Sequence, residues 1–111
     1  MAYTTEAQIK GDSQVYGLSP QIKRYSLLDV GFLELKNGKF QLERPLNPDA
    51  GKAAFYLKMT VNKDLKKFKL MTTTASGLQQ VDIFKRDDPA MLEQLQYILA
   101  ELLERDILIK K

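Results

Sequence analysis

The hydrophobic period of this chain changes once, from two residues to about 3.6, and that change limits the fold more than any other feature. Between residues 53 and 74, apolar and polar side chains alternate, as in β-strands with one buried face. From residue 88 onward, apolar side chains recur every three or four positions, as in an amphipathic helix. Strands followed by one long helix predict an α+β fold, because a single amphipathic helix can cover one sheet.

Two strands are expected at residues 53–61 and 66–74, with a turn at residues 62–65 between them. Another strand is expected at residues 78–85, where Val81 and Ile83 supply the apolar positions, after a turn at residues 75–77. The alternation predicts that one set of side chains in the first two strands faces the core: Phe55, Leu57, Met59, Val61, Phe68, Leu70, Thr72 and Thr74.

The dipeptide Asn37-Gly38 predicts a hairpin over residues 31–44 with a two-residue type I′ turn, because both central positions of that turn need positive φ. Closing the hairpin there gives a register in which the apolar side chains share one face. The expected pairs are Leu35 with Phe40 and Leu33 with Leu42. Residues 45–51 follow as a loop rich in Pro, Asn and Gly.

Residues 19–30 admit two interpretations. Ser19 and Pro20 could cap and open a helix. The apolar residues that follow show no clean helical period, and this favours a strand.

The C-terminal helix is expected to begin with Asp88 as N-cap and Pro89 at the first helical position, and to end near residues 105–106. Residues 107–109 are expected to form a final strand or docking tail, or an edge that pairs with a second copy. The apolar stripe of the helix is expected to form its core face: Met91, Leu92, Leu95, Ile98, Leu99, Leu102 and Leu103.

These elements predict a single α+β domain over residues 1–111. We expect two antiparallel sheets, or one strongly curved sheet, packed around a single long C-terminal helix.

The chain contains no His and no Cys, and these absences exclude many chemistries. They exclude disulfides, thiol nucleophiles, imidazole bases and zinc sites built on His or Cys. No glycine-rich phosphate loop or nucleophile-elbow motif occurs either. Asp87 and Asp88 could help to hold Mg²⁺, but acids at a helix N-terminus ordinarily stabilise the helix. We therefore expect no metal, no cofactor and no catalytic residue, although an enzyme that uses only carboxylate, Lys and Tyr groups stays an alternative.

Positive charge is concentrated in residues 1–86, whereas residues 87–111 are net acidic. Strand parity places lysines and a tyrosine on the outer face of the hairpin formed by residues 53–74, which is suited to binding phosphate groups or a base. Solvated lysines on a strand face are the ordinary explanation for such a pattern. The candidate binding residues are Tyr56, Lys58, Lys67 and Lys69, with Arg24 and Tyr25 as an addition.

The segment Ile22-Lys23-Arg24-Tyr25-Ser26-Leu27-Leu28-Asp29-Val30-Gly31-Phe32, leading into Lys36-Asn37-Gly38-Lys39-Phe40, resembles a small bacterial family of unknown function labelled "putative amino-acid metabolism". The Asp88-Pro89 helix and its Arg105-Asp106-Ile107-Leu108 exit fit the same family. The resemblance implies two sheets around one helix, a shape remotely similar to S-adenosylmethionine decarboxylases, and a gene neighbourhood of sulfur transfer. Because those decarboxylases use His and Cys, this chain lacks their chemistry.

Three functions remain open at this point. The first is a cytoplasmic accessory protein of amino-acid or sulfur metabolism, without a membrane anchor, that binds a partner protein or a small metabolite. The second is an RNA or tRNA adaptor that uses the basic sheet face. The third is an enzyme limited to carboxylate, Lys and Tyr groups.

Overall fold

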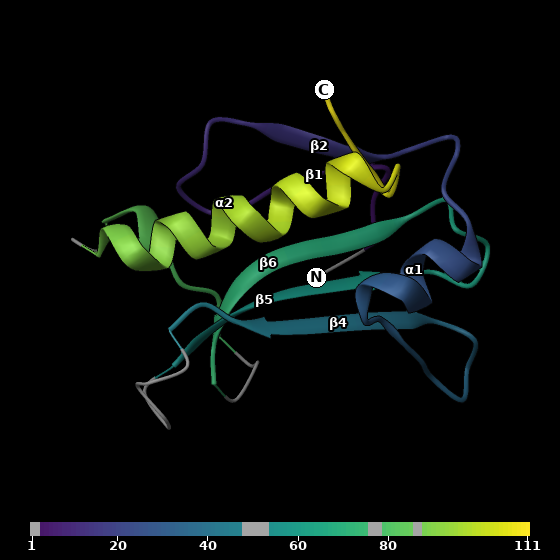
Figure 1. The fold of residues 1–111 in the computed structure, drawn as a ribbon, viewed down its shortest axis with the longest axis horizontal. Coiled ribbons are helices and arrows are strands. Elements are labelled where there is room, and N and C mark those ends of the chain that lie inside the picture. The colour runs from purple at the N-terminus through teal and green to yellow at the C-terminus, as the bar shows by residue number, and fades with distance from the viewer. Residues whose placement is uncertain (1–2, 48–53, 76–78, 86–87) are drawn as a thin grey trace.

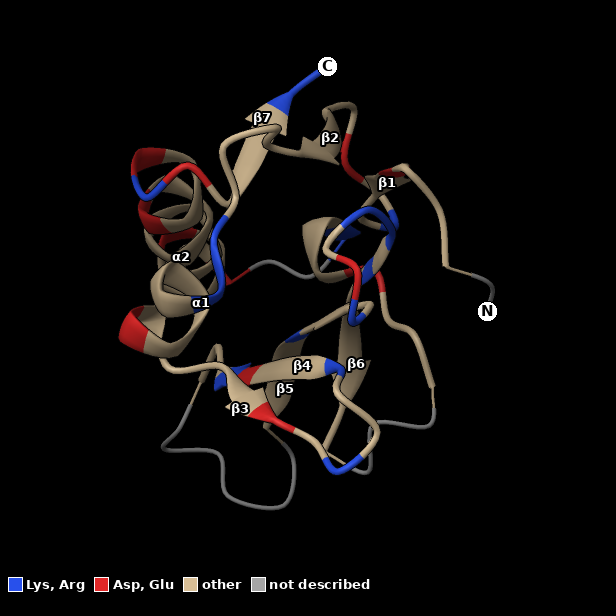
Figure 2. Cartoon of the chain, turned by 90° about the vertical axis from the view of Figure 1, so that its right-hand side faces the viewer, with Lys and Arg blue, Asp and Glu red and all other residues tan. Residues whose placement is uncertain are grey.

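The computed structural model describes residues 3–47, 54–75, 79–85 and 88–111, and its architecture is α+β. A four-stranded antiparallel sheet has the order β3-β4-β5-β6, and a three-stranded antiparallel sheet has the order β1-β2-β7. Figure 2 shows the long helix α2 beside the space between the two sheets. The strands are β1 (Glu6–Gln8), β2 (Val15–Leu18), β3 (Leu33–Glu34), β4 (Phe40–Pro45), β5 (Phe55–Val61), β6 (Phe68–Thr74) and β7 (Leu108–Lys110), and the helices are α1 (Arg24–Val30), η2 (Ile83–Lys85) and α2 (Pro89–Glu104).

The central strands form as the alternation predicts. β5 and β6 pair in antiparallel register from Phe55↔Thr74 to Val61↔Phe68. Leu57, Met59 and Val61 are fully buried, whereas Phe55 is only partly buried at the end of the strand. The turn at residues 62–65 is also present, and Leu65 N–H donates to the Asn62 carbonyl at 2.9 Å.

The predicted hairpin forms, but its predicted register is wrong by one residue. Leu33 pairs with Gln41, Glu34 pairs with Phe40, and Leu35 N–H donates to the Lys39 carbonyl. The loop therefore holds three residues and ends on Gly38 with φ +88°, an arrangement common in hairpins. This shift in register places Leu33 on the outer face, where it is 70% exposed, and the preceding residue, Phe32, is buried in the core.

Residues 19–30 contain a helix, so the strand interpretation is wrong. α1 runs from Arg24 to Val30 and buries Leu27 and Val30, which are three positions apart on one helical face. Gly31 ends it with φ +116°, and its N–H reaches the carbonyls of the last turn. Ser19 does not cap this helix. Its hydroxyl accepts from Gln21 N–H at 3.0 Å in a local turn.

The strand expected at residues 78–85 is also wrong. Gln80 makes a single antiparallel bridge to Thr73, and residues 83–85 form the short 3₁₀ helix η2. One oxygen of the Asp82 carboxylate accepts from Phe84 N–H at 3.0 Å and Lys85 N–H at 3.3 Å, which stabilises the turn. Residues 76–78 of this prediction, like residues 48–51 of the loop predicted after the hairpin, lie outside the described part of the chain.

Helix α2 begins and ends as predicted. The Asp88 side chain accepts from Met91 N–H at 3.2 Å, and Pro89 opens the helix. Leu92 and Leu103 are partly buried, and the rest of the stripe is fully buried: Met91, Leu95, Ile98, Leu99 and Leu102. The final segment docks on the chain's own sheet, because β7 pairs with β2.

The N-terminal segment connects the two sheets. Thr4 exchanges two backbone hydrogen bonds with Phe68 at the edge of β6, at 3.1 and 2.9 Å. Two residues later the same segment becomes β1 and pairs with β2. Figure 1 shows β1 and β2 behind α2, with β6 on the side of the four-stranded sheet next to them. No helix in the described part of the chain is long and apolar enough to cross a membrane.

A lysine groove on the outer face of the four-stranded sheet

The outer face of the four-stranded sheet carries two rows of side chains, most of them polar, that run across three strands. The first row is Gln41, Thr60 and Lys69, which are paired from β4 through β5 to β6. The second row is Glu43, Lys58 and Met71. Lys58 and Lys69 are therefore diagonal neighbours, with Cα atoms roughly 7–8 Å apart by the ordinary spacing of antiparallel strands.

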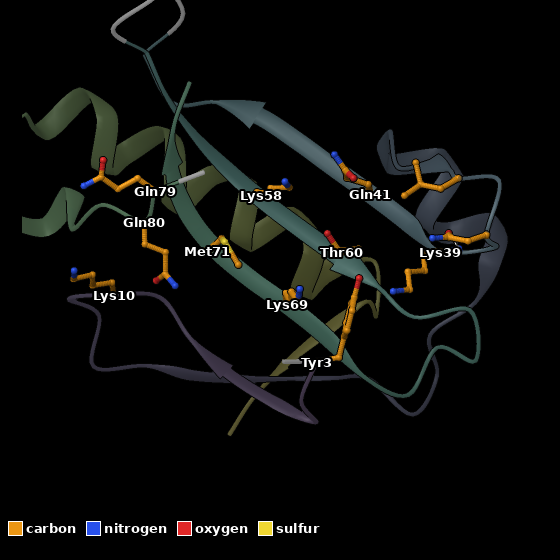
Figure 3. A pocket seen from close by; sticks show the side chains of 12 residues that line it. Tyr3, Lys10, Lys39, Gln41, Lys58, Thr60, Lys69, Met71, Gln79 and Gln80 are labelled. Atoms are coloured by element: carbon orange, nitrogen blue, oxygen red, sulfur yellow. Dashed lines mark hydrogen bonds between the residues drawn. The ribbon is translucent and has the colours of Figure 1, made fainter. Parts of the chain in front are cut away.

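A groove of about 710 Å³ lies over these rows (Figure 3). Its floor comes from β5 and β6, and its ends come from other elements. The hairpin before β4 supplies Lys39, the turn after β1 supplies Lys10, and the N-terminal segment supplies Tyr3. The lining consists of Tyr3, Lys10, Leu35, Asn37, Lys39, Gln41, Lys58, Thr60, Lys69, Met71, Gln79 and Gln80.

Tyr3 lies between two of these lysines. Lys39 Nζ is 4.2 Å from the centroid of the Tyr3 ring, and Lys69 Nζ is 4.5 Å from it. Figure 3 shows the two ammonium groups to either side of the ring. The backbone bridge between Thr4 and Phe68 holds this segment against the edge of β6. The ring is therefore attracted to two cations at once by the cation–π interaction.

The groove is positively charged, and its described lining residues include no carboxylate. Within the described residues, the ion pairs are Arg24–Glu34, Arg44–Glu101 and Lys111–Glu6, and none of them involves a groove lysine. The nearest acid by register is Glu43, opposite Lys58, and its carboxylate accepts from Gln41 Nε2 at 2.7 Å. Four ammonium groups thus share a concave surface with amides and a hydroxyl, all of which can donate hydrogen bonds to an anion.

A second cavity of about 660 Å³ adjoins the groove. Both cavities are lined by Tyr3, Asn37 and Lys39, so they meet at these three residues. The second cavity is completed by Asn62, Lys63 and Asp64 from the turn after β5.

Only some of the candidate residues predicted from the sequence line the groove. Lys58 and Lys69 line the groove, whereas Tyr56 and Lys67 do not, although Tyr56 lies on the same sheet face. Lys67 precedes β6 in the turn and is exposed.

Arg24 and Tyr25 lie on α1 and do not line the groove. Arg24 pairs with Glu34 of β3, and Lys23 Nζ is 6.0 Å from the Tyr25 ring. Arg24 is therefore engaged by a neighbour on the protein surface.

Several groove residues have no signal in the sequence that would place them in a site. The sequence predicts only a hairpin for Lys39 and Gln41, and it predicts no element for the segment that contains Tyr3 and Lys10. Strand parity could have placed Gln41 on the outer face, but the positions of Tyr3 and Lys10 depend on long-range packing.

The described residues contain no group of three Asp, Glu, His or Cys side chains that could hold a metal ion. Asp88 serves as the helix N-cap, and Asp87 lies outside the described residues. The ammonium, amide and hydroxyl groups that line the groove can donate hydrogen bonds to an anion.

The comparisons with known proteins agree with this fold. The sequence profile of the family DUF1831, described as "Putative amino acid metabolism", matches residues 1–109. The chain belongs to this family. The resemblance inferred from its residues is thus confirmed.

A crystal structure gives a relative in the same family. The DUF1831 family protein lp2179 from Lactobacillus plantarum is 50% identical in sequence and superposes with a TM-score of 0.91. The match covers 100% of this chain and 99% of that one. A comparison with curated proteins finds no match.

Proposed function

We propose that this DUF1831 protein is a cytoplasmic, non-catalytic protein that binds a small anionic metabolite of amino-acid metabolism in the lysine groove. The observation that carries the proposal is the composition of the described lining, which has four lysines and no carboxylate. Ammonium and amide groups donate hydrogen bonds to carboxylate and phosphate oxygens, and bonds to charged groups are the stronger ones. The link to amino-acid metabolism is supported by the description of the family.

The shape of the groove favours a small ligand over RNA. Its volume of about 710 Å³ lies within the range of small-molecule sites, which is roughly 300–1,000 Å³. Binding of single-stranded RNA commonly uses an open aromatic face on which bases stack. Lys39 and Lys69 already lie over the Tyr3 ring, so this ring is a poor stacking platform.

Calorimetric titration with inorganic phosphate, succinate and acetate tests the proposal. The variant Lys69→Met removes a groove ammonium and retains a side chain of similar length, so we expect anion affinity to fall about tenfold, as for a lost charge-assisted hydrogen bond. Lys67→Met is the matched control, because Lys67 lies two positions away in sequence and does not line the groove. Equal losses in the two variants, or no anion binding by the unmodified protein, would contradict the proposal.

The salt dependence separates this function from the RNA adaptor. A small anion carries no condensed layer of counterions, so its log K should fall only gently with log salt, through ordinary screening of the lysine charges. An RNA oligomer releases nearly one counterion for each phosphate contact, so its log K should fall steeply. A single-stranded RNA oligomer that binds with a much steeper slope, while the small anions do not bind, would support the adaptor instead. A protein partner in amino-acid or sulfur metabolism stays a prediction, and a pull-down from the native cytoplasm tests it.

A further inference from the structure

We propose that the ligand of the groove is a small dianion, and that it binds by replacing the Tyr3 ring between Lys39 and Lys69. The inference rests on the proposed function and adds the charge of the ligand and the residue that competes with it. Phosphate groups and short dicarboxylates share the required chemistry, since both present two negative charges within a few ångströms.

The ring is a weak partner for the two ammonium groups. Each ammonium lies over the ring face, at 4.2 Å for Lys39 and 4.5 Å for Lys69, and neither has a carboxylate within 4.0 Å among the described residues. Tyr3, Lys39 and Lys69 are all half-buried, and at a site that stays partly hydrated a cation–π interaction shifts an equilibrium by about two- to fivefold. A hydrogen bond from an ammonium to an anionic oxygen is worth about tenfold or more. An anion that reaches both lysines therefore competes successfully with the ring.

Two positive charges at one place favour a ligand with two negative charges. A monoanion neutralises one ammonium and leaves the other against the ring. A dianion can contact Lys39 and Lys69 together, and Thr60 adds a hydroxyl donor in the same row as Lys69. Gln41 Nε2 already donates one hydrogen to Glu43 at 2.7 Å, and its second hydrogen can point to the anion.

Tyr3 is attached in a way that lets its ring move without unfolding the sheet. The backbone hydrogen bonds of this segment to β6 are made by Thr4, and Tyr3 precedes them. Tyr3 lines both the groove and the second cavity. Departure of its ring opens the space between Lys39 and Lys69, while the core beneath β5 and β6 is unchanged.

The chain contains no Trp, so the variant Tyr3→Trp provides a single fluorescent reporter at the site. We would titrate it with inorganic phosphate, succinate and acetate at constant ionic strength and about pH 8, where phosphate is a dianion. We expect a saturable red shift and a fall in anisotropy with phosphate or succinate, and no such change with acetate over the same concentrations. Whichever of phosphate and succinate binds with the higher affinity shows whether the site prefers phosphoryl or dicarboxylate ligands.

Calorimetry on Tyr3→Ala supplies the second measurement. Removal of the competing ring should raise dianion affinity by about two- to fivefold for each of the two lysines that the ring no longer covers. Tyr97→Ala removes an exposed tyrosine of α2 outside the groove and should have no effect.

The inference is overturned if Tyr3→Ala binds dianions as the unmodified protein does or more weakly. It is equally overturned if the fluorescence of Tyr3→Trp stays constant while calorimetry registers binding. In both cases anion binding itself persists and the proposed function stands. If neither the unmodified protein nor Tyr3→Ala binds any of the anions, the proposed function fails as well.

Discussion

Substitution of Gly11 tests how the turn beside the groove is built. Gly11 is the second central residue of the turn that joins β1 to β2, which Asp12 N–H closes by donating to the Ile9 carbonyl at 2.9 Å. Its φ is +89°, a conformation that side chains with a Cβ rarely adopt. A Cβ at this position would also lie 2.1 Å from Oδ1 of Asp82, so Gly11→Ala forces the carboxylate to move.

Two contributions determine how much Gly11→Ala lowers the free energy of unfolding. An alanine in the left-handed region costs about 1–2 kcal/mol. Moving Asp82 weakens its hydrogen bonds to Phe84 and Lys85 at 3.0 and 3.3 Å, and bonds to a charged group are worth about 1.5–3 kcal/mol each, with part recovered by water at this partly exposed site. We expect a total loss of about 2–5 kcal/mol in the free energy of unfolding. For a chain of this size each 1 kcal/mol lowers Tm by about 4 °C.

Urea denaturation of two further variants isolates the contribution of Asp82. Gly38→Ala places alanine at nearly the same φ, +88°, but its Cβ meets only the flexible side chain of Lys63. It should cost about 1–2 kcal/mol. In an Asp82→Ala background, Gly11→Ala should cost about the same 1–2 kcal/mol, since only the backbone strain remains. Equal costs for the two glycine substitutions in the unmodified background would refute the reasoning.

Three other measurements follow from the structure. Burial, and secondarily the charge of Asp12, raise the pKa of Tyr16 above its ordinary value. Because the unfolded chain then loses this proton at lower pH than the folded one, stability is retained below about pH 10 and falls above it. Tyr16→Phe should remove this part of the alkaline loss, and an unchanged pH profile of the free energy of unfolding would contradict the prediction. Leu33→Lys should change stability by no more than about 0.5 kcal/mol, whereas Leu42→Ala should cost about 2–5 kcal/mol. A large loss for Leu33→Lys in urea titrations would favour the two-residue hairpin instead of the observed register. Asp88→Ala should lower the free energy of unfolding by about 1 kcal/mol through loss of the N-cap, and thermal denaturation with no shift in Tm would show that the cap contributes nothing.

The elements that the sequence predicts correctly are those in which several local signals agree. Helix α2 has a capping residue, a proline and an apolar stripe that repeats over four turns. The strands β5 and β6 alternate over seven residues each and are joined by a turn of suitable composition. Each additional repeat of the apolar pattern leaves fewer possible secondary structures and registers, because a wrong one would expose a whole face of apolar side chains.

The errors occur where one residue decides between two local arrangements. Asn37-Gly38 is compatible with a two-residue or a three-residue loop, and the choice depends on whether Phe32 or Leu33 is buried. The structure buries Phe32 at 2% exposure, and the register follows from that packing. Helix α1 has only seven residues, too few to establish a period. Gly31 was the available signal, since glycine commonly ends a helix.

The candidate site was less predictable than the fold because its lysines come from four separate segments. The described residues 54–69 contain five lysines, and among these Lys58 and Lys69 line the groove. The other groove lysines, Lys10 and Lys39, lie in or beside turns whose positions depend on the packing of distant residues. Tyr3 is held by the bridge between Thr4 and Phe68, which joins segments far apart in the sequence and which no periodicity indicates.

The same geometry explains why the fold tolerates a basic groove without acids. Lys58 and Lys69 are diagonal neighbours on the outer face of the sheet, with Cα atoms roughly 7–8 Å apart. Two ammonium groups at that spacing repel by about 0.5 kcal/mol in bulk water and by about 2 kcal/mol at the effective dielectric of a protein surface. Both costs are below the stability of an ordinary domain, about 5–15 kcal/mol. Stability therefore neither requires a carboxylate in the groove nor accounts for its absence from the described lining. The glutamates of α2 lie on another element, as the acidic bands along that helix in Figure 2 show. The lysines of the groove are consequently left with an aromatic ring, amides and a hydroxyl, which are partners that a dianion can displace or join.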